Sequence, residues 1–181
     1  MNFSRTPDPE LLRPPDFHLP SVHFRLAIRA DVRALHRACF PEEPLEEFVA
    51  RFMSSVHQQE KGRLLHVLAV RGAHERPVAT AQLISYTDTI AEIADLMVAE
   101  QARNQGIGTA LIHILGALAA AAGAERLELA VRVENSRALA LYRRLGFRAC
   151  RLLRFPSGHR AILLARDPWP QPEQRDEADA Q

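Results

Sequence analysis

Lysine is almost absent from this chain. Lys61 is the only one, and arginine supplies the rest of the 23 basic residues. The 22 acidic residues balance them to a net charge of +1. Proteins that bind nucleic acid or an anionic membrane through charge carry a basic surplus. The composition therefore predicts neither nucleic acid nor a membrane among the partners.

Cysteine is scarce as well. Cys39 and Cys150 lie far apart and have no CxxC-type neighbour, which argues against a disulfide framework and against a zinc site. The eight histidines are scattered along the chain, and none stands at helical spacing with another histidine beside a carboxylate. We therefore expect no metal cofactor.

Long hydrophobic runs are missing too. The most apolar segment, 110–124, is shorter than the ~20 residues that a membrane-spanning helix needs. No apolar stretch follows the charged N-terminal residues, so no signal peptide is expected. The expected location is the cytoplasm.

The length and composition favour one globular domain. The chain has 181 residues, of which 47% are hydrophobic, enough for a substantial core. Residues 1–22 are rich in proline and predict a tail or an arm lying on the domain. Residues 168–181 predict a polar C-terminal tail. The single domain is therefore expected at 23–167.

Strand and helix patterns alternate through this domain. Strands are expected at 24–28, 64–70, 78–86, 90–99, 127–133, 147–153 and 161–165. Helices are expected at 32–39, after Pro44, between Ile107 and Gly123, and between Asn135 and Gly146. Successive antiparallel strands followed by one crossover helix predict a mixed α/β fold, with a central, mostly antiparallel sheet and helices on both faces.

A glycine-containing turn joins the strand at 90–99 to the next helix. The first amides of a helix have no intrahelical acceptor, and the helix dipole favours negative charge there. Gly106 and Gly108 carry no side chain that would keep a phosphate away from those amides, and Arg103 adds a positive charge. The turn therefore predicts a phosphate-binding loop.

Three phosphate-binding loops compete for this pattern. A Walker loop needs Gly-Lys-Ser/Thr, and no lysine stands here. A dinucleotide fingerprint needs a third glycine where Leu111 stands, although Glu128 lies about as far along as the ribose-binding acid of that motif. The third reading is an acetyl-CoA site, and the dinucleotide reading stays open beside it.

Three motifs between residues 90 and 150 resemble the GCN5-related N-acetyltransferase (GNAT) family. The loop Arg103-Asn104-Gln105-Gly106-Ile107-Gly108 resembles its Gln/Arg-x-x-Gly-x-Gly/Ala motif. Leu96-Met97-Val98 resembles the strand with which the cofactor pairs in that family. Asn135, with Ala138, Leu141-Tyr142 and Leu145-Gly146-Phe147, resembles its second motif. The resemblance implies a GNAT-like fold and direct transfer of an acetyl group from acetyl-CoA to a primary amine.

The resemblance also assigns the cofactor contacts. It implies that the pantetheine arm runs beside Leu96, Met97 and Val98, with the Leu96 amide on the thioester oxygen. The resemblance also implies that the pyrophosphate binds to the loop Arg103-Asn104-Gln105-Gly106-Ile107-Gly108-Thr109. The amides that would hold it are those of Asn104, Gly106, Gly108 and Thr109. Asn135 fits two roles equally, a helix N-cap or a cofactor contact.

Two side chains are candidates for catalysis. Glu92 stands where the histone-acetylating branch of the family has its catalytic glutamate, and regular alternation would put it on the face of Leu96 and Val98, with Asp95 on the other. Acting through water, it would remove the proton of the amine. Tyr142 matches the family's tyrosine that protonates the departing CoA thiolate. The plain alternatives are a solvated strand carboxylate for Glu92 and a core aromatic for Tyr142.

The acceptor side of the sequence is less informative. A small-molecule amine and a protein amine both fit, and a homodimer is left open. The stretch 127–147 also resembles the ribosomal-protein alanine acetyltransferases, but the aromatic-rich end of that branch is missing after Phe147. The alternative to an enzyme is a non-catalytic acyl-CoA-binding module of the same fold.

Overall fold

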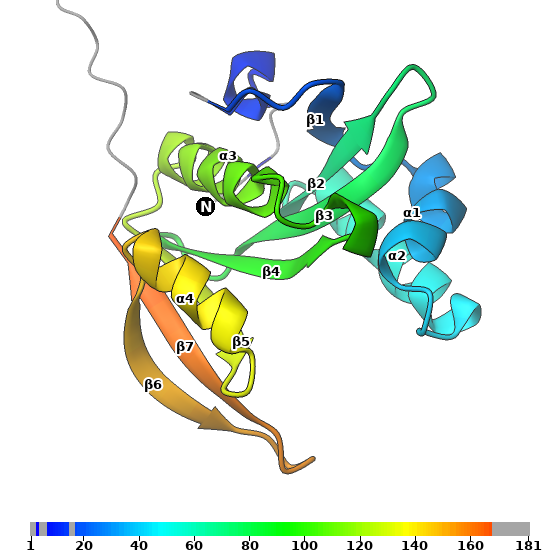
Figure 1. Cartoon of the computed structure of the whole chain (residues 1–181). Helices are drawn as coiled ribbons and strands as arrows, with labels where there is room; N and C mark the ends of the chain where they lie inside the picture. Colours follow the sequence, from blue (N-terminus) through cyan, green and yellow to red (C-terminus); the bar gives the residue numbers. More distant parts are fainter. Residues whose placement is uncertain (1–2, 4–6, 15–16, 168–181) are drawn as a thin grey trace, which may run out of the picture.

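The structure is a computed structural model and describes residue 3, residues 7–14 and residues 17–167. Within these residues, seven strands form one sheet in the order β1-β2-β3-β4-β5-β7-β6 (Figure 1). Every pair is antiparallel except β4 and β5, which α3 connects. The strands are β1 (Val22–Leu26), β2 (Leu64–Arg71), β3 (Arg76–Ser85), β4 (Ile90–Val98), β5 (Arg126–Arg132), β6 (Arg148–Arg154) and β7 (Arg160–Arg166). The helices are α1 (Val32–Cys39), α2 (Leu45–Glu60), α3 (Ile107–Ala121) and α4 (Ser136–Arg144), with short 3-10 turns η1 (Pro9–Leu12), η2 (Arg29–Asp31) and η3 (Glu100–Ala102). The predicted mixed α/β fold is confirmed.

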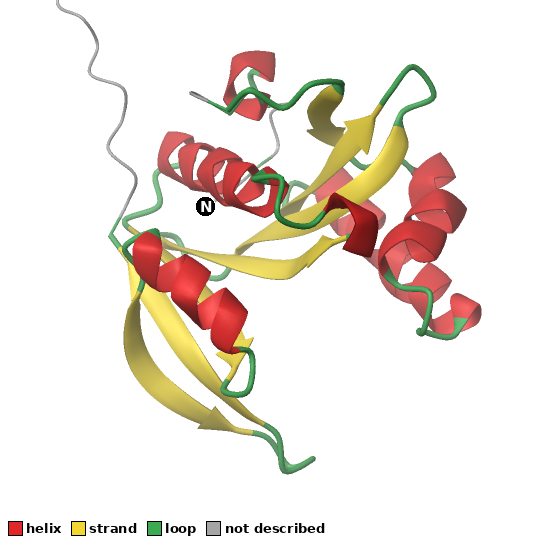
Figure 2. Ribbon diagram, viewed as in Figure 1, coloured by secondary structure: helices red, strands yellow, loops and turns green. Residues whose placement is uncertain are grey.

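Helices cover both faces of this sheet (Figure 2). On one face, Ser55 of α2 lies 2.8 Å from Nδ1 of His66 on β2. On the other face, a Cβ added to Gly108 of α3 would lie 3.4 Å from the Val98 side chain of β4. His66 pairs with Gln82 and Val98 with Ala79, so the two contacts lie on opposite faces of β3. The helices α1 and α2 therefore share one face, and α3 and α4 share the other (Figure 1).

Helix α3 is buried more completely than an amphipathic surface helix would be. Its apolar stripe faces the sheet as predicted, but Ile112 is also fully buried. The N-terminal segment explains this, because η1 packs against α3 and the ring of Phe17 lies 5.3 Å from that of His113. Phe3 is buried as well, and its amide donates to the Gly62 carbonyl at 2.8 Å. The described part of the N-terminal segment therefore lies on the domain as an arm.

A bulge interrupts β4 in its middle. Thr80 of β3 pairs with Met97, whereas Gln82 pairs with Ala94, so β4 holds one extra residue over this step. Asp95 lies at the bulge with a left-handed φ of 49°. The extra residue reverses the alternation, which corrects the prediction for Glu92. Glu92 shares a face with Met97 and the α2-facing side of β3, whereas Val98 points to α3.

Beyond the bulge, β4 and β5 part from each other. Their pairing runs from Ile90 opposite Arg126 to Ile93 opposite Leu129 and goes no further. On the side that faces β5, residues 94–98 therefore have no strand partner among the described residues. This open edge carries the segment that the sequence assigns to the pantetheine arm.

The tail predicted at 168–181 lies outside the described residues. In the part of the chain that the structure describes, no helix is both long and apolar enough to cross a membrane.

Candidate acetyl-CoA site

The opening between β4 and β5 forms a cavity of about 960 Å³. Its walls are β4, the loop after it, the first turn of α3, the end of β5 and one side of α4. The predicted site residues that line it are Glu92, Leu96, Met97, Val98, Arg103, Asn104, Gly106, Gly108, Thr109, Asn135 and Tyr142. The fold thus brings together residues that stand up to 50 positions apart in the sequence, from Glu92 to Tyr142.

Gln105 is the exception. Its side chain turns out of the cavity, where Nε2 donates to the Gln101 carbonyl at 3.1 Å and Oε1 accepts from Arg71. It braces the loop from outside, so its side chain makes no part of the cavity wall.

The loop before α3 has the backbone of an anion site. Gly106 precedes the helix with φ of 82°, and Asn104 is also left-handed with φ of 64°. The first helical hydrogen bond runs from the Ala110 amide to the Gly106 carbonyl at 2.9 Å. The amides before Ala110 consequently have no acceptor inside the helix and can donate hydrogen bonds to phosphate oxygens.

Arginines supply positive charge around this loop, and the sequence reading found only one of them. Arg103 folds back so that Nε donates to the Val98 carbonyl at 3.2 Å. Arg137 of α4 donates to the Asn104 side-chain oxygen across the cavity. Arg132 and Arg144 line the cavity as well. The signal that could have found them is the excess of arginine between the end of β5 and the end of α4.

Asn135 acts as a helix cap in the structure. Its Oδ1 accepts a hydrogen bond from the Ala138 amide at 3.0 Å and so closes the first turn of α4. Asn135 also lines the cavity. Capping is thus what the structure shows, and cofactor contact stays a prediction.

Glu92 lies where β4 and β5 are still paired, directly across from Glu128. Burial raises the pKa of the Glu92 carboxyl, and the negative charge of Glu128 raises it further. Glu128 itself is held by Arg126, whose Nε lies 2.7 Å from its Oε1. A carboxylate with a raised pKa is better matched to accept a proton near neutral pH than an ordinary one.

Tyr142 lies on the α4 wall of the cavity. Its ring is buried and meets Phe147 edge to face at 5.8 Å. Burial raises the pKa of its phenol to about 12, so the hydroxyl is protonated at neutral pH. Among the described residues the hydroxyl has no hydrogen-bond partner, which leaves its proton available to a group in the cavity.

Asp95 does not face away from Glu92, contrary to the sequence reading. The Asp95 carboxylate accepts hydrogen bonds from Arg51 of α2 and Gln82 of β3, so it lies on the α2 side. Because of the bulge, both acids lie on this side, opposite the loop that would hold the phosphates. The cavity therefore has a basic end toward α3 and α4 and an acidic end toward α2.

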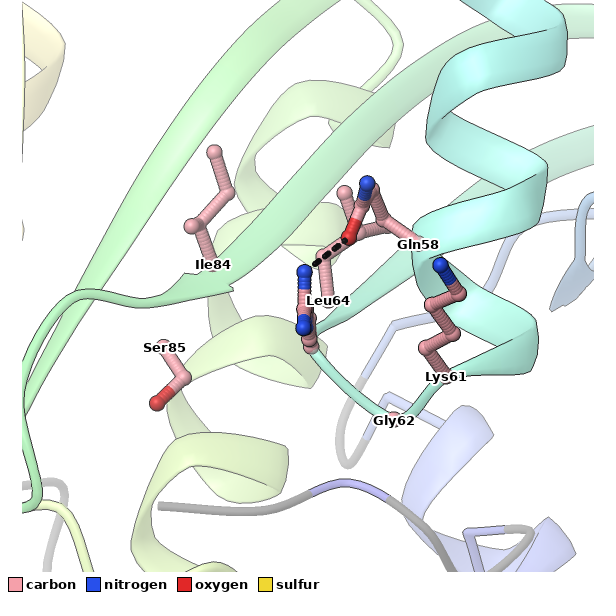
Figure 3. A pocket seen from close by; sticks show the side chains of 7 residues that line it. Gln58, Lys61, Gly62, Leu64, Ile84 and Ser85 are labelled. Carbon is pink, nitrogen blue, oxygen red and sulfur yellow. Dashed lines mark hydrogen bonds between the residues drawn. The ribbon is translucent and has the colours of Figure 1, made fainter.

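A second hollow, of about 500 Å³, lies at the C-terminal end of α2 (Figure 3). Lys61 and Gly62 follow the helix there, and Arg63 donates to Gln58 at 3.3 Å. None of the predicted site residues borders it, so we assign the chemistry to the larger cavity.

Comparison with known proteins gives the family. Residues 29–147 match the model of the Acetyltransferase (GNAT) family. An N-alpha-acetyltransferase of Sulfurisphaera tokodaii is 41% identical over 76 residues, which is 40% of this chain and 46% of the relative. The chain thus spans less than half the length of this curated relative in the match.

Two solved structures share the fold. Ard1 from Thermoplasma volcanium superposes with a TM-score of 0.68 at 18% identity, covering 82% of this chain and 99% of that one. Spermidine N-acetyltransferase from Vibrio cholerae, solved with CoA and spermine, gives a TM-score of 0.66 at 19% identity, covering 83% and 97%. At these identities the likeness shows the fold alone. Because the family model matches well over half of the sequence, the chain belongs to the GNAT family of acetyltransferases.

Proposed function

We propose that this protein transfers an acetyl group from acetyl-CoA to a primary amine. The observation that carries the proposal is the juxtaposition, across one cavity, of the open β4 edge at 94–98 and the unpaired amides at the start of α3. An extended pantetheine chain can pair with the open strand edge, and a pyrophosphate can accept hydrogen bonds from the unpaired amides.

The residues fit such a co-substrate. The amides of Asn104, Gly106, Gly108 and Thr109 would hold the pyrophosphate, with Arg137 adding charge from α4. Leu96, Met97 and Val98 would pair with the pantetheine arm. Acetyl-CoA supplies the activated acetyl thioester, and the reaction forms an N–C bond while the C–S bond breaks.

The reaction needs one proton removed from the amine and one proton delivered to the departing sulfur, and groups that line the cavity would transfer both. An alkyl amine with a pKa near ~10 is almost wholly protonated at neutral pH, so it must lose a proton before it can attack. Glu92 would accept this proton, directly or through water. The Leu96 amide would donate to the carbonyl oxygen as that oxygen gains negative charge. Tyr142 would donate its proton to the sulfur that departs.

The proposal includes the setting of the reaction. The acceptor is an amine on a small molecule or on a protein, and the site is taken to work in the cytoplasm without a metal. A homodimer would form along β6, the outer strand of the sheet, where Leu152 and nearby Phe155 are both exposed. Sedimentation velocity at two protein concentrations tests this part independently of activity.

A panel of amines tests the proposed reaction. Purified protein and acetyl-CoA are incubated with polyamines, amino-acid amides and short peptides, and acetylated products are detected by mass spectrometry. Mass detection is preferred to thiol titration, because exposed Cys150 reacts with thiol reagents. Binding of acetyl-CoA in calorimetry without any acetylated amine would favour the acyl-CoA-binding module. Binding of NAD instead would favour the dinucleotide reading.

A further inference from the structure

Asp95 has an unusual backbone conformation for its place in the fold. It adopts a left-handed φ of 49° in the middle of β4, where an L-residue other than glycine is disfavoured by ~1 kcal/mol. Asp and Asn tolerate this region better than other side chains do, but a strand gives them no reason to enter it. A contact from outside β4 would therefore stabilise the bulge.

Arg51 of α2 makes that contact. Its Nη1 lies 2.5 Å from Oδ2 of Asp95, and Gln82 donates to the same oxygen at 3.2 Å. The opposite side of the guanidinium donates two hydrogen bonds to Glu43, from Nη2 at 2.7 Å and from Nε at 3.2 Å, one to each carboxylate oxygen. One arginine thus ties the α1–α2 connection to the bulge of β4.

Packing fixes the position of this guanidinium. Its central carbon lies 4.9 Å from the Phe40 ring centre and 5.2 Å from that of Phe48. Phe48 is fully buried, so the surface on which the arginine rests belongs to the core. The fork of Arg51 is therefore held on three sides: by a carboxylate at each end and by aromatic rings along one face.

These ion pairs contribute little to overall stability. The side chains of Arg51 and Asp95 are 38% and 39% exposed, and pairs at such exposure are worth ~0–1 kcal/mol. The ion pair with Asp95 matters more for the geometry of the backbone than for stability. The backbone angles of Asp95 set the plane of the peptide that joins it to Leu96. The direction of the Leu96 N–H therefore depends on the conformation that Arg51 holds.

We propose that Arg51 is a positioning residue for acetyl transfer, which acts through Asp95 to aim the Leu96 amide at the oxygen of the reacting thioester. The inference rests on the proposed function and adds a residue of α2, remote from the phosphate loop, to the machinery. Loss of a whole oxyanion donor costs ~10²–10³ in rate. A misdirected donor loses part of that, so Arg51→Ala should lower kcat roughly tenfold. Acetyl-CoA affinity should stay within about twofold, since the phosphates bind at the other end of the cavity.

The test is a double-mutant cycle with glycine. Asp95→Gly removes the carboxylate but adopts the left-handed conformation without strain, so the bulge no longer needs the arginine. Arg51→Ala is expected to lower kcat in the wild-type background and to have no further effect in the Asp95→Gly background. An equal loss of kcat in both backgrounds would show that Arg51 acts by another route and would overturn the inference.

Arg29→Ala is the matched control. Arg29 also makes a two-pronged pair, with its Nη2 2.9 Å and 3.0 Å from the two oxygens of Glu60, but on the surface away from the cavity. It should leave kcat unchanged. If Arg51→Ala behaves like Arg29→Ala, the proposed role is wrong. Arg51→Lys, which keeps the charge and loses the fork, should give an intermediate kcat and guards against a variant that fails to fold.

A spectroscopic readout separates positioning from general damage. A CoA ketone analogue with a ¹³C-labelled carbonyl binds without reacting, and its C=O stretch moves to lower frequency when an amide donates to it. The downshift should shrink in Arg51→Ala and stay in Arg29→Ala, while calorimetry gives similar affinities. An unchanged stretch in Arg51→Ala would overturn the inference. Failure of the wild type to bind acetyl-CoA would instead overturn the proposed function.

Discussion

Glu92 and Glu128 face each other across the parallel pair β4 and β5, one residue before the last paired positions, Ile93 and Leu129. Glu128 is held by Arg126, whereas Glu92 lines the cavity. The two neighbouring carboxylates therefore differ in their partners: Glu128 forms an ion pair with Arg126, whereas Glu92 has no arginine partner among the described residues.

Glu92→Gln is expected to slow the reaction while leaving the protein at least as stable. The raised pKa means that native Glu92 holds its proton to higher pH than the unfolded chain does. Stability therefore falls as pH rises through the window between the unfolded pKa, ~4.3, and the raised folded value. The neutral glutamine removes that loss, so Tm at neutral pH should rise slightly.

General-base catalysis typically contributes ~10²–10⁴-fold to the rate, and we expect Glu92→Gln to lower kcat by a factor near the lower end of that range. The rising limb of its pH–rate profile should also flatten. Glu128→Gln is the control. It removes the repelling charge, so the rising limb should shift to lower pH while kcat is retained. A wild-type pH profile in Glu92→Gln would show that water or another group takes the proton.

Tyr142→Phe separates an acetyltransferase from a protein that only binds acyl-CoA. The change removes a hydroxyl that has no partner among the described residues, so no buried group loses its hydrogen bond and Tm should hold. We expect kcat to fall ~10²-fold, with little change in the KM for acetyl-CoA. Tyr86, which is 68% exposed, provides the matched variant Tyr86→Phe, which should be fully active. Equal activity of the two variants would make Tyr142 a core aromatic.

Gly108 tests the phosphate loop, but its substitution needs a compensating change. A Cβ at this position would lie 3.4 Å from the Val98 side chain, so Gly108→Val alone would disturb the packing of α3 on β4. In the Gly108→Val/Val98→Ala variant the packing against β4 is relieved, but a branched side chain still stands on the cavity wall beside the free amides. Acetyl-CoA affinity should still fall at least tenfold, which is ~1.4 kcal/mol, relative to Val98→Ala. Wild-type affinity in the folded double variant would contradict the assignment of the loop.

His66 predicts how the fold responds to acid. It is buried between Ser55 and Thr80, with its ring nitrogens 2.8 Å and 2.7 Å from their hydroxyls, and burial lowers its pKa to about 4. The pKa of His66 in the folded protein lies below the unfolded value of ~6.5. Its contribution to the free energy of unfolding is therefore complete above pH ~6.5 and declines as pH falls toward 4. The free energy of unfolding, measured by urea titration, should fall by on the order of 3 kcal/mol.

His66→Gln is expected to remove most of this pH dependence, because a neutral amide cannot take up the proton. His57, which is exposed on α2, provides the control His57→Gln, which should keep the wild-type slope. An unchanged slope in His66→Gln would mean that another buried group controls the acid transition.

Sequence reasoning captured what repeats along the chain and missed what depends on distant partners. The helix predicted at 32–39 occupies Val32–Cys39, and Pro44 directly precedes α2 as expected. The bulge at Asp95 escaped prediction because nothing in Ile-Ala-Glu-Ile-Ala-Asp marks an extra residue, so the regular alternation of an ordinary strand was assumed. Its conformation depends on Arg51, which stands 44 residues earlier. The face of Glu92 was wrong for the same reason.

The cofactor loop was recognisable because its requirement is local. Gly106 and Gly108 stand at the start of a helix, and both the turn and the free amides follow from a few adjacent residues. Arg137 could not be predicted in the same way, because its contact with Asn104 exists only once α4 has docked beside α3. The acidic end of the cavity depends on side chains from α2, β3, β4 and β5, which no short motif brings together.

The N-terminal arm has a consequence for how the chain folds as it is made. Phe17 and Leu19 lie where a Cβ on Gly106 would touch them, at 3.9 Å each, and Phe17 also meets His113. These contacts span roughly 90 residues, so the arm is synthesised well before the helix that it packs against and is among the last segments to find its place. Until α3 has been synthesised, Phe17 and Leu19 lack the surface that they cover. A chaperone that shields Phe17 and Leu19 would therefore serve the folding of the cofactor loop.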